Sequence, residues 1–240
     1  MKFYKTPAVV LGMAVTGLAV VRSLARQGIK VVALDPDPRK PALSTRYADC
    51  RVCPDVHQSP DQFKNFLLAI AKEIGEGAVL LPTNDNFNEF LNKNREELSK
   101  HFKFVMTDRK VMDQLMDKKG QSDLAESSQV PMPKTFYPAN AIEIKNIAEQ
   151  VRFPVIIKGL TTSLWRQKYG DKKGMIASDR ETLIKEFEQI DRAKIDCVVQ
   201  EIIAGDDQCH YKLCAYIGQN GEPLLTFTLQ KIRQYPCHFG

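Results

Sequence analysis

Residues 8–17 read AVVLGMAVTG, an apolar run rich in β-branched side chains that ends at a glycine and leads into a segment with helical spacing. Leu18, Val21 and Leu24 continue that spacing up to Gly28. The pattern predicts a buried strand, a tight turn and a helix that packs back on the strand. A strand, turn and helix in this order is the unit from which the first part of the fold is built.

The same alternation repeats through the first hundred residues. A helix over 60–74 is indicated by apolar residues on one face, and Asp85 is the expected cap of a helix over 85–98. Strands are expected at residues 30–35, 50–53, 78–81 and 102–106. Strands and helices that alternate in this way favour a parallel sheet covered by helices on both faces. We therefore expect an α/β domain over residues 1–106.

The pattern changes after residue 106. Two short helices are expected between residues 109 and 128, followed by an extended connection over 130–135 that contains two prolines. The remaining elements expected are helices over 139–150 and from residue 178, and strands over 154–158, 174–177, 197–203, 210–217 and 224–229. Gly221, in a turn segment between the last two strands, indicates a hairpin. These elements predict a mostly antiparallel α+β domain over 107–240.

Composition limits the classes of function. The chain has 240 residues, 43% of them hydrophobic and 26% charged, which excludes disorder and a coiled coil. A net charge of +5, without a basic run, is weak evidence for nucleic acid or a membrane, so small molecules are the expected partners. Lys2 and Lys5 before an apolar run imitate a signal peptide, but Gly12 and Gly17 interrupt that run. We expect a cytoplasmic protein.

The six cysteines are too few for a disulfide scaffold. Cys50 and Cys53 have the spacing of a metal or redox pair, but no second pair lies at zinc-finger distance. Buried thiols are therefore favoured over metal ligands.

The first turn, from Gly12 to Gly17, has the form G-x-A-x-x-G, and Asp35 ends the next strand where a dinucleotide-binding fold places its ribose-binding acid. Ala14 stands where that motif needs a glycine for close approach of the pyrophosphate. A turn kept for packing of helix on strand is therefore favoured over bound NAD. A nicotinamide-dependent or nucleotide-sensing protein that uses residues 1–106 remains the alternative function.

Three features of residues 107–240 suggest anion or nucleotide binding. Lys158 ends a buried strand, and a basic loop follows that contains Arg166, Lys168, Lys172 and Lys173. That loop is either a solvated surface or a flap over phosphates. The strand over 197–203 ends in Gln200 and Glu201 before Gly205, which suits a nucleotide but also an ordinary turn. Lys231 and Arg233 are expected on one face of a strand, for which an exposed edge strand is the other interpretation.

The order of these motifs is more specific than any one of them. The order is Asp117-Lys118, then VPMPKT over 130–135, FPVIIK over 153–158, VVQEIIAG over 198–205 and KIRQYP over 231–236. It resembles the ATP-grasp superfamily, and most closely its carboxylate-amine ligases similar to carbamoyl phosphate synthase and D-aspartate ligase. Residues 1–106 resemble the Rossmann-like domain that precedes the grasp in this family. The resemblance implies a ligase that joins a carboxylate to an amine or ammonia through an acyl-phosphate.

The resemblance also implies a set of site residues. Lys118 and Lys158 would hold the α and β phosphates of ATP, with Lys168 and Lys172 in the flap above them. Gln200, Glu201 and the backbone of Ile203 would form the adenine hinge, and Asp207 would bind the ribose. Lys231 and Arg233 would face the γ-phosphate or the acyl-phosphate as the catalytic residues. The resemblance implies small-molecule carboxylates and amines as substrates. It is also compatible with a homodimer.

Three departures from the family pattern qualify this assignment. Gly159 follows Lys158 where proline is usual, and Gln200 stands where many members have glutamate. The carboxylates and asparagine that hold two Mg²⁺ ions in the family have no counterpart after Asp207, where only Glu222 follows. We therefore expect Mg²⁺ ligands beyond Gly240, a partial ATP-grasp domain over 107–240, and no turnover by residues 1–240 alone.

Overall fold

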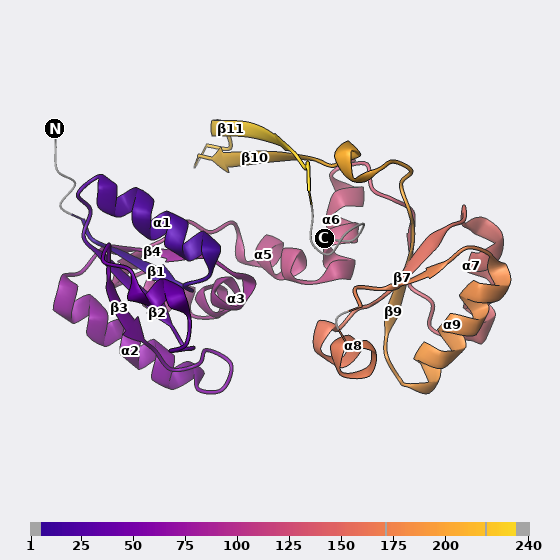
Figure 1. Ribbon diagram of the computed structural model, residues 1–240, viewed down its shortest axis with the longest axis horizontal. Helices are drawn as coiled ribbons and strands as arrows, with labels where there is room; N and C mark the ends of the chain where they lie inside the picture. Colours follow the sequence, from indigo (N-terminus) through magenta and orange to yellow (C-terminus); the bar gives the residue numbers. More distant parts are fainter. Residues whose placement is uncertain (1–5, 171, 219, 234–240) are drawn as a thin grey trace. The chain divides into compact units, whose positions relative to one another are not determined.

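The computed structural model describes residues 6–170, 172–218 and 220–233, and it divides into two compact units, Met1–Leu124 and Ala125–Gly240 (Figure 1). The division falls later in the chain than the boundary at 106/107 that the sequence predicts. Two short helices, α5 (Arg109–Met116) and α6 (Lys118–Ser127), follow that predicted boundary, and α5 packs on α3 (Asp85–Lys93) of the first unit.

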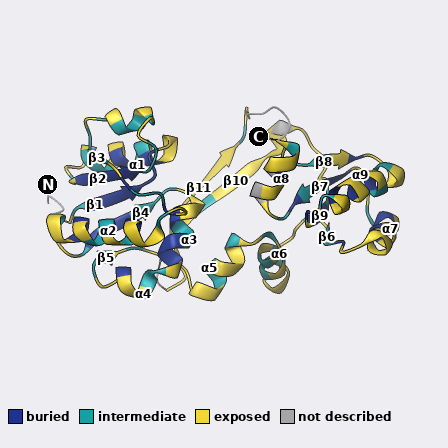
Figure 2. Ribbon diagram, turned by 90° about the horizontal axis from the view of Figure 1, so that it is seen from below, coloured by how far each residue is buried: buried dark blue, intermediate teal, exposed yellow. Residues whose placement is uncertain are grey.

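A five-stranded parallel sheet forms the centre of the first unit. Its strands are β1 (Ala8–Leu11), β2 (Val31–Asp35), β3 (Asp49–Val52), β4 (Ala78–Pro82) and β5 (Phe102–Lys103), in the order β3-β2-β1-β4-β5. β1, in the middle, is buried along its whole length and appears dark blue in Figure 2. Burial on both faces explains why this strand is a continuous apolar run rather than an alternating one.

Successive residues of β1 enter different cores, because side chains alternate across a strand. Val9 and Leu11 join a core that also contains Phe63 of α2 (Pro60–Ile74). Val10 joins a separate core on the other face with Val21 of α1 (Val15–Arg26). Helices therefore cover both faces, and the predicted α/β architecture is confirmed.

The helix expected over 85–98 is divided in the structure. α3 ends at Lys93, and Asn94 separates it from α4 (Arg95–Leu98). The cap of α3 is Asn84 rather than Asp85, because the Oδ1 of Asn84 accepts a hydrogen bond of 3.1 Å from the backbone N–H of Phe87. A side-chain oxygen one residue earlier satisfies an N–H of the first turn that has no partner within the helix.

The link between α3 and α5 accounts for the position of the unit boundary. The amide of Asn92 donates a hydrogen bond of 2.6 Å to Asp113 of α5, and Arg95 donates to the carbonyl oxygen of Thr107 at 3.0 Å. Asn92 is buried, so its amide needs a partner inside the protein. Residues 107–116 are thus held to the first unit.

The second unit contains a four-stranded antiparallel sheet. Its strands are β6 (Thr135–Phe136), β7 (Val155–Gly159), β8 (Met175–Ala177) and β9 (Cys197–Glu201), in the order β6-β9-β7-β8. One face carries the core, in which Ile144 of α7 (Ala141–Gln150) and Leu183 and Phe187 of α9 (Arg180–Arg192) pack against the strands. The opposite face is available for a site.

A hairpin of β10 (Tyr211–Ile217) and β11 (Pro223–Gln230) completes the described part of the second unit, as the turn signal predicted. The expected strand through Lys231 and Arg233 is wrong, because β11 ends at Gln230. Beyond that residue the ladder has one last bond, from the backbone N–H of Lys231 to the carbonyl oxygen of His210. Among the described residues no helix is long and apolar enough to cross a membrane.

Candidate functional site

A cleft of about 480 Å³ lies on the face of the second unit's sheet that carries no core helix. It begins at the ends of β7 and β9 and continues along the segment that leads to β10. Its lining residues are Pro133, Ile156, Lys158, Gln200, Glu201, Ile202, Ile203, Ala204, Gly205, Asp206, Cys209, His210 and Tyr211. An apolar wall with a few converging polar groups is typical of a small-molecule site.

Strand alternation explains which side chains enter the cleft. Ile157 and Val199 are fully buried in the core, so their neighbours Ile156, Lys158 and Gln200 face the other way. β7 and β9 pair Ile156 with Gln200, and Lys158 with Val198. The register therefore brings a lysine and an amide, 42 residues apart in the sequence, to the same place.

A chain of hydrogen bonds joins these groups to β6. The Nζ of Lys158 donates to the Oε1 of Gln200 at 3.1 Å, and the Nε2 of Gln200 donates to the Oγ1 of Thr135 at 2.9 Å. The Oγ1 of Thr135 in turn donates to the carbonyl oxygen of Pro133 at 2.8 Å. The side chains of Gln200 and Thr135 thus position the ammonium group of Lys158.

The carboxylate of Glu201 is bonded within the protein, although Glu201 is also one of the residues that line the cleft. Its Oε1 accepts a hydrogen bond of 2.8 Å from the backbone N–H of Arg152, and its own backbone N–H donates to the carbonyl oxygen of Lys134. Since Glu201 follows Gln200 on the strand, alternation directs its side chain away from the cleft face. Its carboxylate is used to join β9 to the start of β7.

The segment after β9 supplies the far wall of the cleft. Ile203 is 71% exposed there, and Gly205 has a φ of +142° that favours glycine. The Oδ1 of Asp206 accepts from the backbone N–H of Gln208 at 3.0 Å and from the Sγ of Cys209 at 3.3 Å. Asp207 begins the short 3-10 helix η2 (Asp207–Cys209), but its side chain lies outside what the structure describes. Asp206 is the described carboxylate of this wall.

The structure also shows cleft residues that the sequence analysis did not single out. Asp206, Cys209, His210 and Tyr211 line the cleft, and Thr135 bonds to the lining residue Gln200. Thr135 ends the motif VPMPKT and Asp206 lies between Gly205 and Asp207, so a signal for both was present in the sequence. Cys209, His210 and Tyr211 had none, because their position depends on the turn that returns the chain to β10.

Lys118 lies in the first unit, at the start of α6, whereas the cleft lies in the second. Burial lowers the pKa of Lys118 below its ordinary value, against the opposing effect of the neighbouring Asp117. A partly buried ammonium group is favoured by an anionic partner.

The segment expected as a basic loop contains a helix, α8 (Thr162–Tyr169), so the prediction of an unstructured loop is wrong. The reason is Trp165, which is 3% exposed, and its Nε1 donates to the carbonyl oxygen of Lys172 at 2.6 Å. Lys168 and Lys172 are exposed, and the side chain of Arg166 lies outside the described part of the chain. The cations are therefore carried on a segment with an apolar anchor.

Gly159 lies directly against the side chain of Trp165. A Cβ atom at Gly159 would lie 2.7 Å from the Cε3 and 2.8 Å from the Cβ of Trp165. These distances are too short for any side chain, so a glycine at position 159 makes room for the indole ring. β7 thus ends in two adjacent residues with different tasks, Lys158 in the cleft and Gly159 under α8.

Lys231 and Arg233 follow β11. Lys231 is half-buried, and its backbone N–H bonds to the carbonyl oxygen of His210, a cleft residue. Arg233 is exposed. The rest of the motif, residues 234–240, lies outside the described residues, so the role of both cations stays a prediction.

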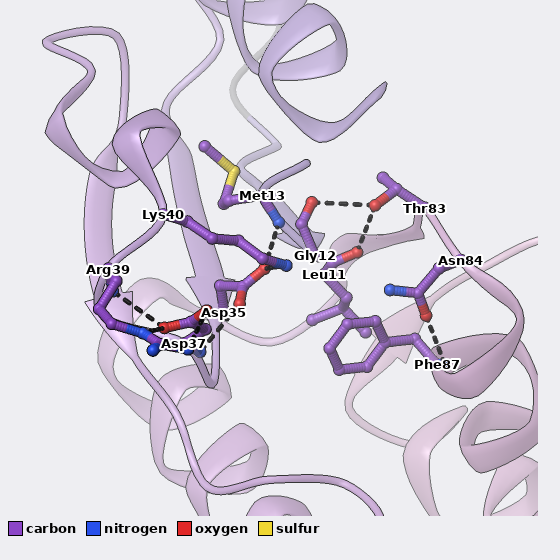
Figure 3. A network of polar contacts seen from close by, with 10 residues as sticks. All are labelled: Leu11, Gly12, Met13, Asp35, Asp37, Arg39, Lys40, Thr83, Asn84 and Phe87. Carbon is purple, nitrogen blue, oxygen red and sulfur yellow. Dashed lines mark hydrogen bonds and ion pairs between the residues drawn. The ribbon is translucent and has the colours of Figure 1, made fainter. Parts of the chain in front are cut away.

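Asp35, the acid at the end of β2 beside the first turn, is bonded to groups of the protein itself (Figure 3). Asp35 is fully buried, and its Oδ2 accepts from the backbone N–H of Met13 and from the Nζ of Lys40, both at 2.7 Å. Gly12 has a φ of +95°, and a Cβ atom there would lie 2.7 Å from the Oγ1 of Thr83. A Cβ atom at Gly17 would lie 1.8 Å from the carbonyl oxygen of Gly12. The turn is built for close packing of helix on strand, which disfavours the nicotinamide alternative.

We expect Asp35→Asn to lower the free energy of unfolding of the first unit by about 1 to 3 kcal/mol, because three donors around this buried carboxylate lose a charged acceptor: the backbone N–H groups of Met13 and Asp37 and the Nζ of Lys40. Urea unfolding followed by circular dichroism measures the change. Asp37→Asn is the matched control, since that carboxylate lies at the surface beside Arg39. An equal loss in both variants would contradict a structural role for Asp35.

Among the described cysteines, Cys53 and Cys197 are buried as predicted and Cys50 and Cys214 are half-buried, but Cys209 is exposed, so the prediction of a buried thiol is wrong there. Cys50 and Cys53 belong to cores on opposite faces of the first sheet, and both are free thiols. Burial raises the pKa of Cys53 to about 12, and that of Cys197 to about 12 as well. Within the described ranges no group of three or more His, Cys, Asp or Glu side chains could hold a metal ion.

Comparison with known proteins gives three relevant similarities. The sequence is 26% identical over 208 residues to the D-aspartate ligase of Enterococcus faecium, a match that covers 79% of this chain and 49% of the ligase. The structure of N5-carboxyaminoimidazole ribonucleotide synthetase in its ADP complex superposes with a TM-score of 0.72 at 14% identity, over 98% of this chain and 56% of that one. An L-amino acid ligase from Bacillus licheniformis gives 0.64 at 12% identity, over 100% and 54%.

The chain spans about half the length of the curated relative that it matches. No protein-family model matches it. The fold of the chain is that of the ATP-grasp ligases, so the resemblance inferred from the order of the motifs is confirmed.

Proposed function

We propose that this chain, which has the fold of the ATP-grasp ligases, is the ATP-binding portion of a ligase that joins a small-molecule carboxylate to an amine or to ammonia. The observation that carries the proposal is the cleft in which Lys158, Gln200 and the segment 201–206 converge on one face of the sheet. The similarity to a D-aspartate ligase and the ADP complex of a synthetase of the same fold support it.

Each part of the cleft suits one part of ATP. The apolar side chains of Ile156, Ile202 and Ile203 would provide surfaces for the adenine ring, and the backbone of Ile203 would provide a donor and an acceptor for its edge. Asp206, or Asp207 as the sequence predicts, would accept the ribose hydroxyl groups. Lys158, at the end of β7, would contact the phosphates through a charge-assisted hydrogen bond.

The proposed reaction has two steps. An oxygen of the substrate carboxylate attacks the γ-phosphorus of ATP, and ADP leaves with the electrons of the broken P–O bond. The nitrogen of the amine then attacks the acyl carbon, the bond from that carbon to the phosphate oxygen breaks, inorganic phosphate leaves with its electrons, and the nitrogen releases a proton to solvent. Lysine side chains close to the phosphates stabilise the charge that develops in the first step.

Mg²⁺ is part of the proposal only as an expectation. It would neutralise phosphate charge, but the described residues contain no cluster that fits a metal ion, so no step is assigned to it. We also propose a cytoplasmic location, because the five cysteines among the described residues are free thiols, which is typical of a reducing compartment. The homodimer remains a prediction.

We expect isothermal titration calorimetry to show ATP binding to the chain more tightly than NAD. The cleft of the second unit is open to a nucleotide, whereas Asp35 of the first turn is already bound by Met13 and Lys40. Asp35→Asn should leave ATP affinity unchanged within about twofold, because the acid lies in the other unit and a difference that small is below 0.5 kcal/mol. Tighter binding of NAD than of ATP would favour the nicotinamide alternative.

A further inference from the structure

The hydrogen-bond chain behind Lys158 has a defined direction. The carbonyl oxygen of Pro133 can only accept, so the hydroxyl group of Thr135 must use its single proton for the bond of 2.8 Å between them. The Oγ1 of Thr135 can then only accept from Gln200. A backbone carbonyl, which cannot be reoriented without moving β6, therefore sets the direction of every bond that follows.

Gln200 transmits this direction to the cleft. An amide has a donor end and an acceptor end, and the 2.9 Å bond to Thr135 requires the donor end, Nε2, to face the hydroxyl. The acceptor end, Oε1, is then the one that faces the ammonium group of Lys158 at 3.1 Å. If the amide were reversed, two donors would meet at the Lys158 end and two acceptors would meet at the Thr135 end.

The strand register places these three residues together. β6 pairs Thr135 directly with Gln200, and β7 pairs Ile156 with Gln200, two residues before Lys158 on the same face. All three side chains are half-buried, which makes hydrogen bonds stronger and mismatched donors more costly than at an exposed site.

We propose that Thr135 is a positioning residue for the phosphate-binding lysine: its hydroxyl orients the amide of Gln200, and the amide oxygen holds Lys158 in the cleft. This inference rests on the proposed function, because it takes Lys158 as a phosphate contact. Thr135 is not among the residues that line the cleft, so it acts on Lys158 through Gln200.

Thr135→Val tests the inference with little change of shape, since valine is also β-branched and suits a strand. Without the hydroxyl the amide can reverse and present its NH₂ group to Lys158. We expect ATP affinity to fall roughly three- to tenfold, the scale of one hydrogen bond, while AMP affinity stays within about twofold. Thr135→Ser, which keeps the hydroxyl, should restore the ratio of ATP to AMP affinity.

Repeating Thr135→Val in a Gln200→Glu variant distinguishes a loss of amide orientation from general damage to the fold. In Gln200→Glu both oxygens of the carboxylate accept, so its two ends are equivalent and a reversal changes nothing. Adding Thr135→Val to Gln200→Glu should therefore leave the ratio of ATP to AMP affinity within about twofold of that of Gln200→Glu alone. If Thr135→Val lowers the ratio equally in both backgrounds, or not at all with Gln200 present, the inference is overturned.

A measurement without nucleotide tests the positioning role of Thr135 separately from the proposed ATP-binding function. Nuclear Overhauser contacts should join the Nε2 protons of Gln200 to the methyl group of Thr135 in the unsubstituted chain and shift toward the Lys158 side chain in Thr135→Val. Absence of the contacts in the unsubstituted chain would overturn the inference. If the contacts appear and shift but ATP does not bind, the positioning network is supported and the proposed function fails.

Discussion

Lys158→Met should lower the affinity of the chain for ATP by about ten- to a hundredfold, because one charge-assisted hydrogen bond contributes about 1.5 to 3 kcal/mol. Lys158 ends the buried strand β7 and faces the cleft beside Gln200, where its charge is partly shielded from solvent. Calorimetric titration of ATP and of AMP with each variant gives the two affinities. AMP lacks the β and γ phosphates, so it should lose much less affinity than ATP.

Lys145→Met is the matched control for this substitution. Lys145 is an exposed lysine on α7, the helix that packs on the core face of the same sheet. Its replacement removes the same charge from the same unit without touching the cleft, so both affinities should remain within about twofold, a change below 0.5 kcal/mol. An equal loss of ATP and AMP affinity in Lys158→Met would mean that the substitution damages the fold rather than a phosphate contact.

Trp165→Ala should lower the free energy of unfolding of the second unit by about 3 to 5 kcal/mol, the range measured when a large aromatic side chain is removed from a core. Trp165 is 3% exposed, packs against Tyr169 with ring centroids 4.6 Å apart and bonds to the carbonyl oxygen of Lys172. Urea unfolding followed by circular dichroism measures the loss, since the substitution removes the only tryptophan. Trp165→Phe should lose much less.

The close approach of Gly159 and Trp165 gives a sharper form of the same test. Gly159→Ala alone should destabilise the second unit by about 1 to 3 kcal/mol, because its Cβ would overlap the indole ring. In the Trp165→Ala background the added methyl group meets no ring, so the further loss should be close to zero. Additive losses in the double variant would show that Gly159 is required for another reason.

The buried ring of Trp165 fixes the segment that carries Lys168 and Lys172. Lys168 and Lys172 belong to, or directly follow, a helix whose position depends on one buried ring, rather than a loop without apolar contacts. The sequence predicted a loop because α8 has few apolar residues and three glycines surround it. Burial of Trp165 against a glycine of β7 outweighs that local preference, and such tertiary contacts are invisible to a local pattern.

Short sequence patterns were sufficient to predict those elements whose formation depends mainly on neighbouring residues. The apolar face of residues 60–74 predicted α2 with the same bounds, and the uninterrupted apolar run over 8–11 predicted a strand buried on both faces. The chemistry of a single side chain could also be anticipated, as for Lys158 at the end of its strand. The order of the motifs then identified the fold.

The sequence by itself determined the elements, their order and the residue types available for phosphate and adenine, because periodicity and side-chain chemistry are written residue by residue. Only the tertiary structure decided which groups of the protein meet, such as Asp35 with Lys40 and the carboxylate of Glu201 with the backbone of Arg152. It also placed Thr135 beside Gln200, 65 residues away. Such pairs depend on strand register, and register is set by packing of the whole sheet on its core rather than by any one stretch of sequence.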